Sequence, residues 1–373
     1  PAIRFKGFSD AWEQRKLGDI ASDMVAGGDI DKDLILAEGQ YPVIANALTG
    51  DGIVGYYDKE YRVNAPAVTV TGRGDVGHAK ARLVNFTPVV RLLSVKSEHD
   101  VFFLENAINT LKIVIESTGV PQLTVPQLAK YEVAFPRQLD EEEHIGAFFK
   151  QLDHLITLHQ RECISFTGRA DRLILTANKK RTTSSWEQRK AIDIADYSKG
   201  NGYSKGDLTD AGTPIILYGR LYTKYQFAIS EVDTFAFPRN GAVYSQGNEV
   251  IVPASGETAE DIARASAVEK SGVLLGGDLN ILRPFDFINP LFLALAISNG
   301  EPQKELAKKA QGKSVVHIHN TDIQEVTIAY PSRTEQDRIV SVFRQLDNLI
   351  TLHQRELEKL QNIKKSMLEK MFV

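Results

Sequence analysis

The chain has 373 residues, of which 43% are hydrophobic and 25% are charged, and its formal net charge is −4. This length suffices for two or three globular domains. A single cysteine, Cys163, excludes an internal disulfide, and no apolar run reaches the length of a membrane span. We therefore expect a cytoplasmic protein that does not enter a membrane. The weakly acidic total leaves nucleic-acid binding open, because such binding depends on where the basic residues cluster.

The first landmark in chain order is the sequence Trp-Glu-Gln-Arg-Lys at residues 12–16, which returns unchanged at 186–190. Two dissimilar regions follow these landmarks, at 22–130 and 196–325. Both are rich in Gly, Val, Ile, Tyr and turn signals, so we expect mostly strands with short helices at 101–116 and 289–299. The clearest strand patterns lie at 67–70, 81–84, 92–95, 214–217, 249–252 and 272–275.

A strand that ends in proline precedes a long helical pattern in each half, at 131–136 and at 326–331. Asp140 or Thr334 could cap the helix that follows. The two helical patterns contain QLDHLITLHQRE at 151–162 and QLDNLITLHQRE at 345–356, which differ at one position. The chain therefore carries an internal duplication.

Apolar residues in both helical patterns recur at alternating spacings of 4 and 3, which is a heptad seam. Each helix would bury this stripe, and the simplest partner for each helix is the other. We expect the first helix to run from about Asp140 to about Ala177, with a basic exposed joint at 168–185. The central seam residues are Phe149, Leu152, Ile156, His159, Phe343, Leu346, Ile350 and His353.

The segment Gly72–Gly77 matches the GxGxxG pattern of dinucleotide-binding proteins. Such a site needs a helix to open at the glycines, but the following residues alternate like a strand. We therefore expect a tight glycine-rich loop between strands. Its basic residues are candidate DNA contacts, the alternative being a solvated turn: Arg73, His78, Lys80 and Arg82.

Further candidate DNA contacts lie in basic, turn-like stretches interleaved with aromatics, mostly in the second half. Arginine and amide side chains read base edges, while lysine and tyrosine commonly hold phosphates. The alternative is a solvated loop beside a partly buried tyrosine cluster. The candidates are Gln122, Lys199, Tyr203, Lys205, Tyr218, Arg220, Tyr222, Lys224, Lys313 and Ser314.

The sequence contains only incomplete matches to catalytic and metal-binding patterns, which argues against an enzyme. Asn289-Pro-Leu-Phe292 is similar to the NPP(F/Y) signature of adenine methyltransferases, but leucine replaces the second proline and no cosubstrate loop precedes it. We interpret it as a capped helix start. His317 and His319 lack a third ligand. We expect no catalytic residues, no metal and no bound cofactor.

The apolar face of the two helical patterns is wider than one seam needs. A second partner surface explains the extra residues, with additional core packing as the alternative. These residues are Phe148, Leu155, Leu158, Val342, Leu349 and Leu352.

The layout resembles the specificity subunit of a bacterial Type I restriction-modification enzyme. The repeated WEQRK blocks and the two QLDxLITLHQRE helices carry this resemblance, which covers essentially the whole chain. It implies an α+β fold of two globular, mostly β target recognition domains, separated by two long antiparallel coiled-coil helices. The corresponding ranges are 1–139 for the first recognition domain, 140–183 for the central helix and linker, 184–332 for the second recognition domain and 333–373 for the C-terminal helix.

The resemblance also implies partners. Each recognition domain would read one half of a bipartite, asymmetric double-stranded DNA target. The helices would set the spacing and dock two modification subunits, which use S-adenosylmethionine; restriction subunits would add ATP- and Mg-dependent translocation and cleavage. Two alternatives remain: a stand-alone sequence-specific DNA-binding regulator without a modification partner, and a fused adenine methyltransferase, which would need the missing motifs.

Overall fold

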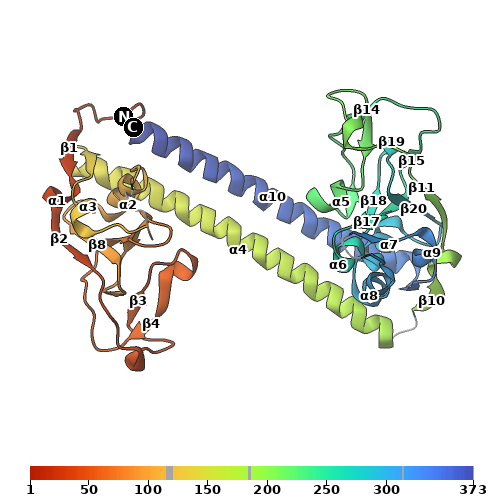
Figure 1. Cartoon of the computed structure of the whole chain (residues 1–373), viewed down its shortest axis with the longest axis horizontal. Helices are drawn as coiled ribbons and strands as arrows, with labels where there is room; N and C mark the ends of the chain where they lie inside the picture. Colours follow the sequence, from red (N-terminus) through yellow and green to blue (C-terminus); the bar gives the residue numbers. More distant parts are fainter. Residues whose placement is uncertain (115–120, 184–185, 313–314, 373) are drawn as a thin grey trace. The chain divides into compact units, whose positions relative to one another are not determined.

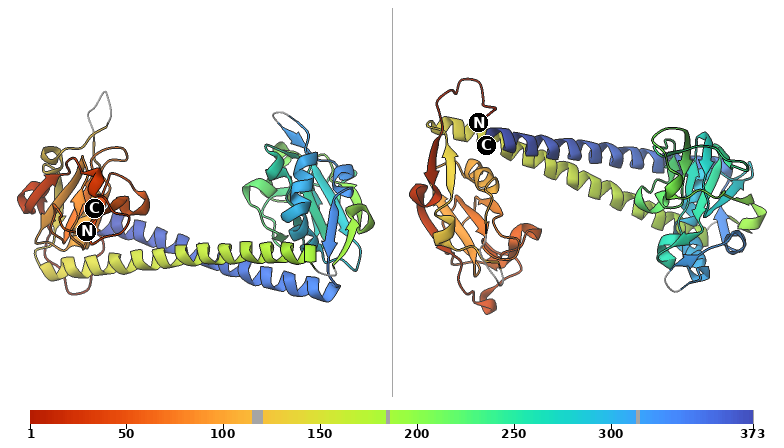
Figure 2. Two further views of the ribbon diagram at one scale, coloured as in Figure 1. Left: turned by 90° about the horizontal axis from the view of Figure 1, so that it is seen from below. Right: turned by 45° about the horizontal axis from the view of Figure 1, so that its top comes forward.

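The computed structural model describes residues 1–114, 121–183, 186–312 and 315–372 (Figure 1). The chain forms two units. Unit 1 comprises residues 1–161 and 353–373, and unit 2 comprises residues 162–352. The two chain ends meet in unit 1, where the backbone N–H groups of Ala2 and Ile3 donate to the carbonyl of Lys370 (Figure 2).

Unit 1 contains a four-stranded sheet in the order β2-β8-β5-β6 and a three-stranded sheet in the order β4-β3-β7. Helix α2 packs against β5 and β6. The elements are β1 (Glu13–Lys16), α1 (Leu17–Ile20), β2 (Ala21–Ala26), β3 (Tyr41–Ile44), β4 (Ile53–Tyr57), β5 (Ala67–Thr71), β6 (Ala79–Arg82), β7 (Thr87–Pro88), β8 (Leu92–Ser97), α2 (Val101–Asn109), α3 (Val125–Leu128) and β9 (Glu132–Phe135).

Unit 2 contains a five-stranded sheet in the order β11-β20-β16-β18-β13 and a four-stranded sheet in the order β14-β12-β19-β15. Its strands are β10 (Glu187–Lys190), β11 (Ala195–Lys199), β12 (Thr213–Ile216), β13 (Ala228–Ile229), β14 (Phe235–Ala236), β15 (Tyr244–Gln246), β16 (Glu249–Pro253), β17 (Ser255–Gly256), β18 (Ser266–Val268), β19 (Ser271–Leu275), β20 (Leu279–Pro284), β21 (Val316–His317) and β22 (Thr327–Tyr330). Its helices are α5 (Arg220–Thr223), α6 (Ala259–Ile262), α7 (Pro290–Ile297), α8 (Gly300–Lys309) and α9 (Asn320–Gln324).

Two long helices, α4 (Leu139–Thr183) and α10 (Arg333–Met371), contribute residues to both units. In unit 1 they run antiparallel, because Asp153 contacts Lys364 at 2.6 Å while His159 contacts His353 at 2.9 Å. The histidine contact joins two Nδ1 atoms. The two histidines expected on the seam therefore contact each other.

The ends of the long helices are anchored in the cores that the strands form. Phe149 of α4 is fully buried in the core of unit 1, and Met371 of α10 joins the same core. Val340 of α10 is buried in the core of unit 2, where Phe343 also packs. Burying a side chain of this size contributes about 1.5–3 kcal/mol, so the N-terminal part of α4 and both ends of α10 are anchored.

The helix ends differ from the sequence-based expectation in three places. Ser332, not Thr334, precedes α10, and its Oγ accepts from the backbone N–H of Glu335 at 3.4 Å. Asp140 likewise lies inside the first turn of α4. The stretch 168–185 was expected to be an exposed joint, but α4 continues as a helix to Thr183. Residues 184 and 185 lie outside the described part.

The frame around the long helices is the same in both units. Asp100 caps α2 by accepting from the N–H groups of Phe102 and Phe103, and Asn289 caps α7 in the same manner. The backbone N–H of each capping residue donates to a buried side chain on a long helix, Glu142 or Gln336. The expected capped helix start at Asn289 is confirmed. The duplication therefore extends from the sequence to the hydrogen-bonded frame.

Candidate nucleic-acid interface

The glycine-rich segment Gly72–Gly77 joins the antiparallel strands β5 and β6, so no helix opens there. Thr71 closes the loop, since its Oγ1 donates to the carbonyl of Asp75 at 2.6 Å and accepts from the N–H of His78 at 2.9 Å. Gly77 has a φ of +93°, which favours glycine. The loop therefore lacks the helix N-terminus that a dinucleotide site requires.

The structure brings two predicted contact residues together beside this loop. Arg73 forms an isolated antiparallel bridge with Gln122, and the N–H of Leu123 donates to the carbonyl of Gly72 at 2.9 Å. Arg73 is exposed and Gln122 is half-buried. Guanidinium and amide groups are the side chains that read base edges in DNA, so this pair suits such a contact.

Three further candidates, His78, Lys80 and Arg82, line one groove of about 460 Å³ in unit 1. Arg82 donates from Nε to the Thr69 hydroxyl at 3.0 Å, and burial lowers its pKa. Glu105 lies at the same groove, where burial raises the pKa of its carboxyl group. The groove therefore combines an exposed lysine with a poorly solvated polar wall.

The candidate contact residues of the loop at 199–205 in unit 2 differ in their exposure. Tyr203 is only 7% exposed, and its hydroxyl accepts from the backbone N–H of Arg239 at 2.8 Å. The Arg239 guanidinium lies over the Tyr203 ring, 5.2 Å from its centroid. Tyr203 therefore supports a neighbouring turn and is not itself a surface contact, whereas Lys199 and Lys205 are exposed as expected.

The turn that Tyr203 supports is a candidate that the sequence reasoning missed. Phe237 is 66% exposed, and Arg239 is exposed beside it with its guanidinium paired to the Asp207 carboxylate. Asn201 fixes the far side of the turn by donating from Nδ2 to the carbonyl of Gly241 at 2.6 Å. The Phe-Pro-Arg-Asn-Gly run is a turn signal that holds an aromatic and a cation, so the pattern was visible in the sequence.

Arg220 has an intramolecular role, which corrects its expected position at the surface. Its side chain is 8% exposed and bonds the carboxylate of Asp233 at 2.6 Å. It also donates to the Gln226 side chain and to the carbonyl of Glu231, each at 3.0 Å. The guanidinium therefore cross-links the segment that follows α5. Arg220 is not among the proposed DNA contacts. Lys224 pairs with the same Asp233 but remains exposed.

The two tyrosines near Arg220 also differ in exposure. The Tyr222 hydroxyl donates to the carbonyl of Ser255 at 2.7 Å, and burial raises the pKa of Tyr222. Tyr218 is exposed and contacts Tyr222 edge to face. Tyr218 thus remains a surface candidate, while Tyr222 holds α5 against β17.

The strand pair β17–β21 occupies in unit 2 the position of the Arg73–Gln122 bridge in unit 1. Both link the segment after a central sheet strand to the segment before the proline-ended strand. Ser255 and His317 face each other there, with Oγ and Nδ1 3.2 Å apart. Sequence reasoning considered His317 only as a metal ligand and missed Ser255. Lys313 and Ser314 lie outside the described residues.

The wide apolar face of the long helices divides by exposure. Phe148 packs against Phe5 and Phe149, with ring centroids 5.9 and 5.3 Å apart, so it belongs to the core of unit 1. The other five residues are 38–53% exposed: Leu155, Leu158, Val342, Leu349 and Leu352. The seam residues Phe149 and Leu152 are buried, and Ile156, Phe343, Leu346 and Ile350 are half-buried.

Within the described residues, no group of three or more His, Cys, Asp or Glu side chains is arranged to hold a metal ion. Across the same part of the chain, no helix combines the length and the apolarity that a bilayer crossing demands.

The family model for the Type I restriction modification DNA specificity domain matches residues 9–164 and again residues 183–362. A type I specificity subunit of Mycoplasma pneumoniae is 30% identical over 145 residues, and a second one is 28% identical over 160 residues. These matches span 38% and 42% of the chain, and less than half of each relative: 39% and 47%. The MjaVIII specificity subunit of Methanocaldococcus jannaschii is 20% identical, covering 96% of the chain and 91% of that relative.

The fold also matches a solved structure. The S subunit of a type I restriction-modification system from M. genitalium superposes with a TM-score of 0.73 at 15% identity, over 100% of this chain and 99% of that one. The expected α+β class and duplicated architecture are thereby confirmed. Because the family model matches both halves of the sequence, the chain belongs to the family of type I restriction-modification DNA specificity subunits.

Proposed function

We propose that each unit reads one half of a bipartite, asymmetric double-stranded DNA target. This proposal is supported by the observation that the two units share one hydrogen-bonded frame around the long helices but present different loop residues to solvent. The capping residues and long-helix contacts correspond in the two units, whereas the polar side chains of the candidate DNA-contact loops do not. Arg73 and Gln122 form the face of unit 1, and Phe237 and Arg239 belong to the face of unit 2. Different faces on one frame suit two different half-sites.

We further propose that the long helices set the distance between the half-sites. A helix advances 1.5 Å per residue, so the 45 residues of α4 are roughly 68 Å long. One turn of DNA is about 34–36 Å, which leaves unread bases between two reading faces on such a spacer. The proposal therefore includes a gap of fixed length.

The exposed leucines on α4 and α10 support docking of two modification subunits. Leu155 and Leu158 correspond to Leu349 and Leu352 in the duplicated sequence, and all four are exposed. A surface present twice suits two copies of one partner. These subunits would bring S-adenosylmethionine, and restriction subunits would bring ATP and Mg; the present chain would contribute recognition without catalysis.

Two measurements test this function. The chain is expressed with the candidate modification subunit, and the methylated positions in genomic DNA are sequenced. We expect one bipartite motif, and no methyl transfer by the purified chain alone with S-adenosylmethionine. Tight, specific DNA binding by the chain without any co-purifying modification subunit would instead favour a stand-alone regulator. Methyl transfer by the rigorously purified chain would contradict both.

A further inference from the structure

Strands β1 and β10 carry the same four residues, Glu-Gln-Arg-Lys, and all four side chains are exposed in both. Packing restricts which side chains a buried position tolerates, but a surface position is free to change. The regions between the repeated landmarks have indeed diverged. Core packing therefore does not explain an identical solvent-facing strand in both units, and a contact that both strands make with the same partner provides a reason.

The two strands also have the same setting. Glu13 pairs with Phe135 and Glu187 pairs with Tyr330, and the following residues keep that register in both units. Among the described strands, each pair forms a separate two-stranded sheet, so β1 and β10 each have an open edge. The aromatic at the end of each partner strand is followed by proline and then by a long helix.

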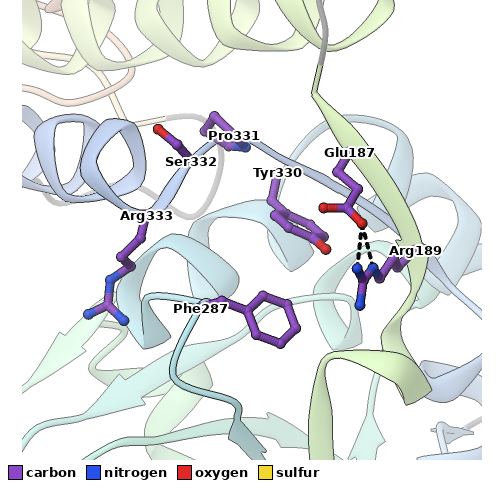
Figure 3. A pocket seen from close by; sticks show the side chains of 7 residues that line it. All are labelled: Glu187, Arg189, Phe287, Tyr330, Pro331, Ser332 and Arg333. Atoms are coloured by element: carbon purple, nitrogen blue, oxygen red, sulfur yellow. Dashed lines mark hydrogen bonds and ion pairs between the residues drawn. The ribbon is translucent and has the colours of Figure 1, made fainter.

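A groove lies at this position in each unit. The groove of unit 2 measures about 440 Å³, and Figure 3 shows its lining side chains. Glu187 and Arg189 are joined by an ion pair of 2.5 Å, and the Arg189 guanidinium lies over the Phe287 ring at 5.5 Å. Tyr330 is 5% exposed, and its hydroxyl interacts with the Glu187 carboxylate at the wall of the groove.

The groove of unit 1 measures about 520 Å³ and has a related lining. Its aromatic wall is Phe135, and Glu13 receives an ion pair from Arg137 at 3.0 Å. Arg15 lines the groove, is exposed, and has no ion pair within the described residues. Glu142 at the rear is fully buried against His99 and is not presented to a ligand.

The exposed charges of both grooves favour an anionic partner. Each groove presents two guanidinium groups and one exposed carboxylate. In unit 2 Arg189 pairs with Glu187 at 2.5 Å and Arg333 pairs with Asp337 at 3.0 Å, so an incoming carboxylate would share these guanidinium groups. Guanidinium groups bind carboxylates in a planar, two-pronged geometry, and the aromatic walls suit an adjoining apolar side chain.

We propose that the two grooves are a matched pair of docking sites, each for the same carboxylate-bearing segment of one modification subunit. This inference rests on the proposed function, which supplies two copies of that partner. The sites are built from the repeated Glu-Gln-Arg-Lys strand, so they stay alike while the DNA-reading faces differ. One subunit docks at β1 and the other at β10.

Charge reversal at the matched arginines tests the proposal. Arg15→Glu, Arg189→Glu and the double variant are each mixed with purified modification subunit, and the complexes are counted by native mass spectrometry. The wild-type chain should carry two modification subunits, each single variant one, and the double variant none. Neutral variants Arg15→Gln and Arg189→Gln should weaken the affected site at least about tenfold, with a smaller salt dependence than the wild type.

The controls separate failure of the docking sites from failure of the function. Lys304→Glu reverses an exposed charge on α8 and should leave two subunits bound. All variants should unfold at the wild-type temperature, because the altered side chains are exposed. A wild-type chain that binds no modification subunit would overturn the proposed function itself. A double variant that still binds two subunits with wild-type affinity would overturn the grooves alone.

Discussion

Arg73 and Arg220 have the same side-chain chemistry and opposite surroundings. Arg73 stands exposed on a hairpin loop beside Gln122, whereas Arg220 is 8% exposed and bonds three partners within unit 2. A guanidinium whose donors are already engaged cannot read a base edge without first breaking those bonds. Burial therefore decides which of the two arginines remains available to DNA.

Replacing Arg220 with alanine should lower the free energy of unfolding of unit 2 by about 1.5–3 kcal/mol, because hydrogen bonds to charged groups are lost. Urea unfolding followed by circular dichroism measures this change. Lys224→Ala is the matched control: Lys224 pairs with the same Asp233 but is 54% exposed, so its loss should cost less than about 1 kcal/mol. Equal effects of the two variants would contradict the structural role of Arg220.

Replacing Arg73 with alanine should weaken recognition in one half-site and leave stability unchanged. A lost base contact costs about 1–3 kcal/mol and relaxes specificity at one position, whereas a lost phosphate contact weakens all sequences alike. Selection of bound DNA sequences by the assembled complex distinguishes the two cases, and the other half-site is the internal control. Unchanged affinity and specificity would remove this loop from the DNA interface.

At the scale of elements, the long helices use one sequence pattern for several contacts. Phe149 and Met371 join the core of unit 1, and His159 meets His353 on the seam. Leu349 and Leu352 occupy neighbouring turns of α10 and remain 38% and 53% exposed. A helix of this kind has a buried stripe that anchors it and an apolar stripe that stays partly exposed.

The double substitution Leu349→Asp with Leu352→Asp should prevent docking of one of the two modification subunits while changing the stability of the chain by no more than about 0.5 kcal/mol. Gel filtration with the partner measures assembly, and thermal unfolding measures stability. Leu346→Asp is the comparison, since Leu346 lies on the half-buried seam and its charge should destabilise the chain. Normal assembly by the double variant would place these leucines in solvent in the complex as well.

At the scale of the whole molecule, the proposed ruler depends on a helix that continues to Thr183 without a joint at 168. A continuous helix transmits an added length along its axis, whereas a flexible joint would absorb it. The frame at each end, with Glu142 or Gln336 bonded to a capping residue, is independent of the length between them.

Inserting four residues after Thr176 adds about one turn, or roughly 6 Å, to α4. We expect the unread gap of the DNA target to lengthen while both half-sites keep their bases. Methylome sequencing of cells that carry the insertion reads both features at once. The same four residues inserted in the surface loop after Lys59 are a control that should leave the gap unchanged. An altered half-site, or an unchanged gap in the helix variant, would contradict the ruler.

The sequence by itself determined the duplication, the order of elements and the family. Repeated blocks need no three-dimensional information, and heptad spacing directly predicts which residues face a partner helix, as His159 and His353 do. Alternation of apolar residues likewise located strands such as β5 and β16. These features are local, since they depend on residues a few positions apart.

Only the tertiary structure determined which polar side chains are exposed and which are bonded within the protein. Arg220 and Tyr203 match the pattern of a DNA-facing loop, but Asp233 and Arg239, distant in sequence, engage them. The grooves beside β1 and β10 likewise form only when strands over a hundred residues apart pair. Exposure and hydrogen-bond saturation are properties of neighbours in space, and one sequence does not reveal which neighbours folding will bring.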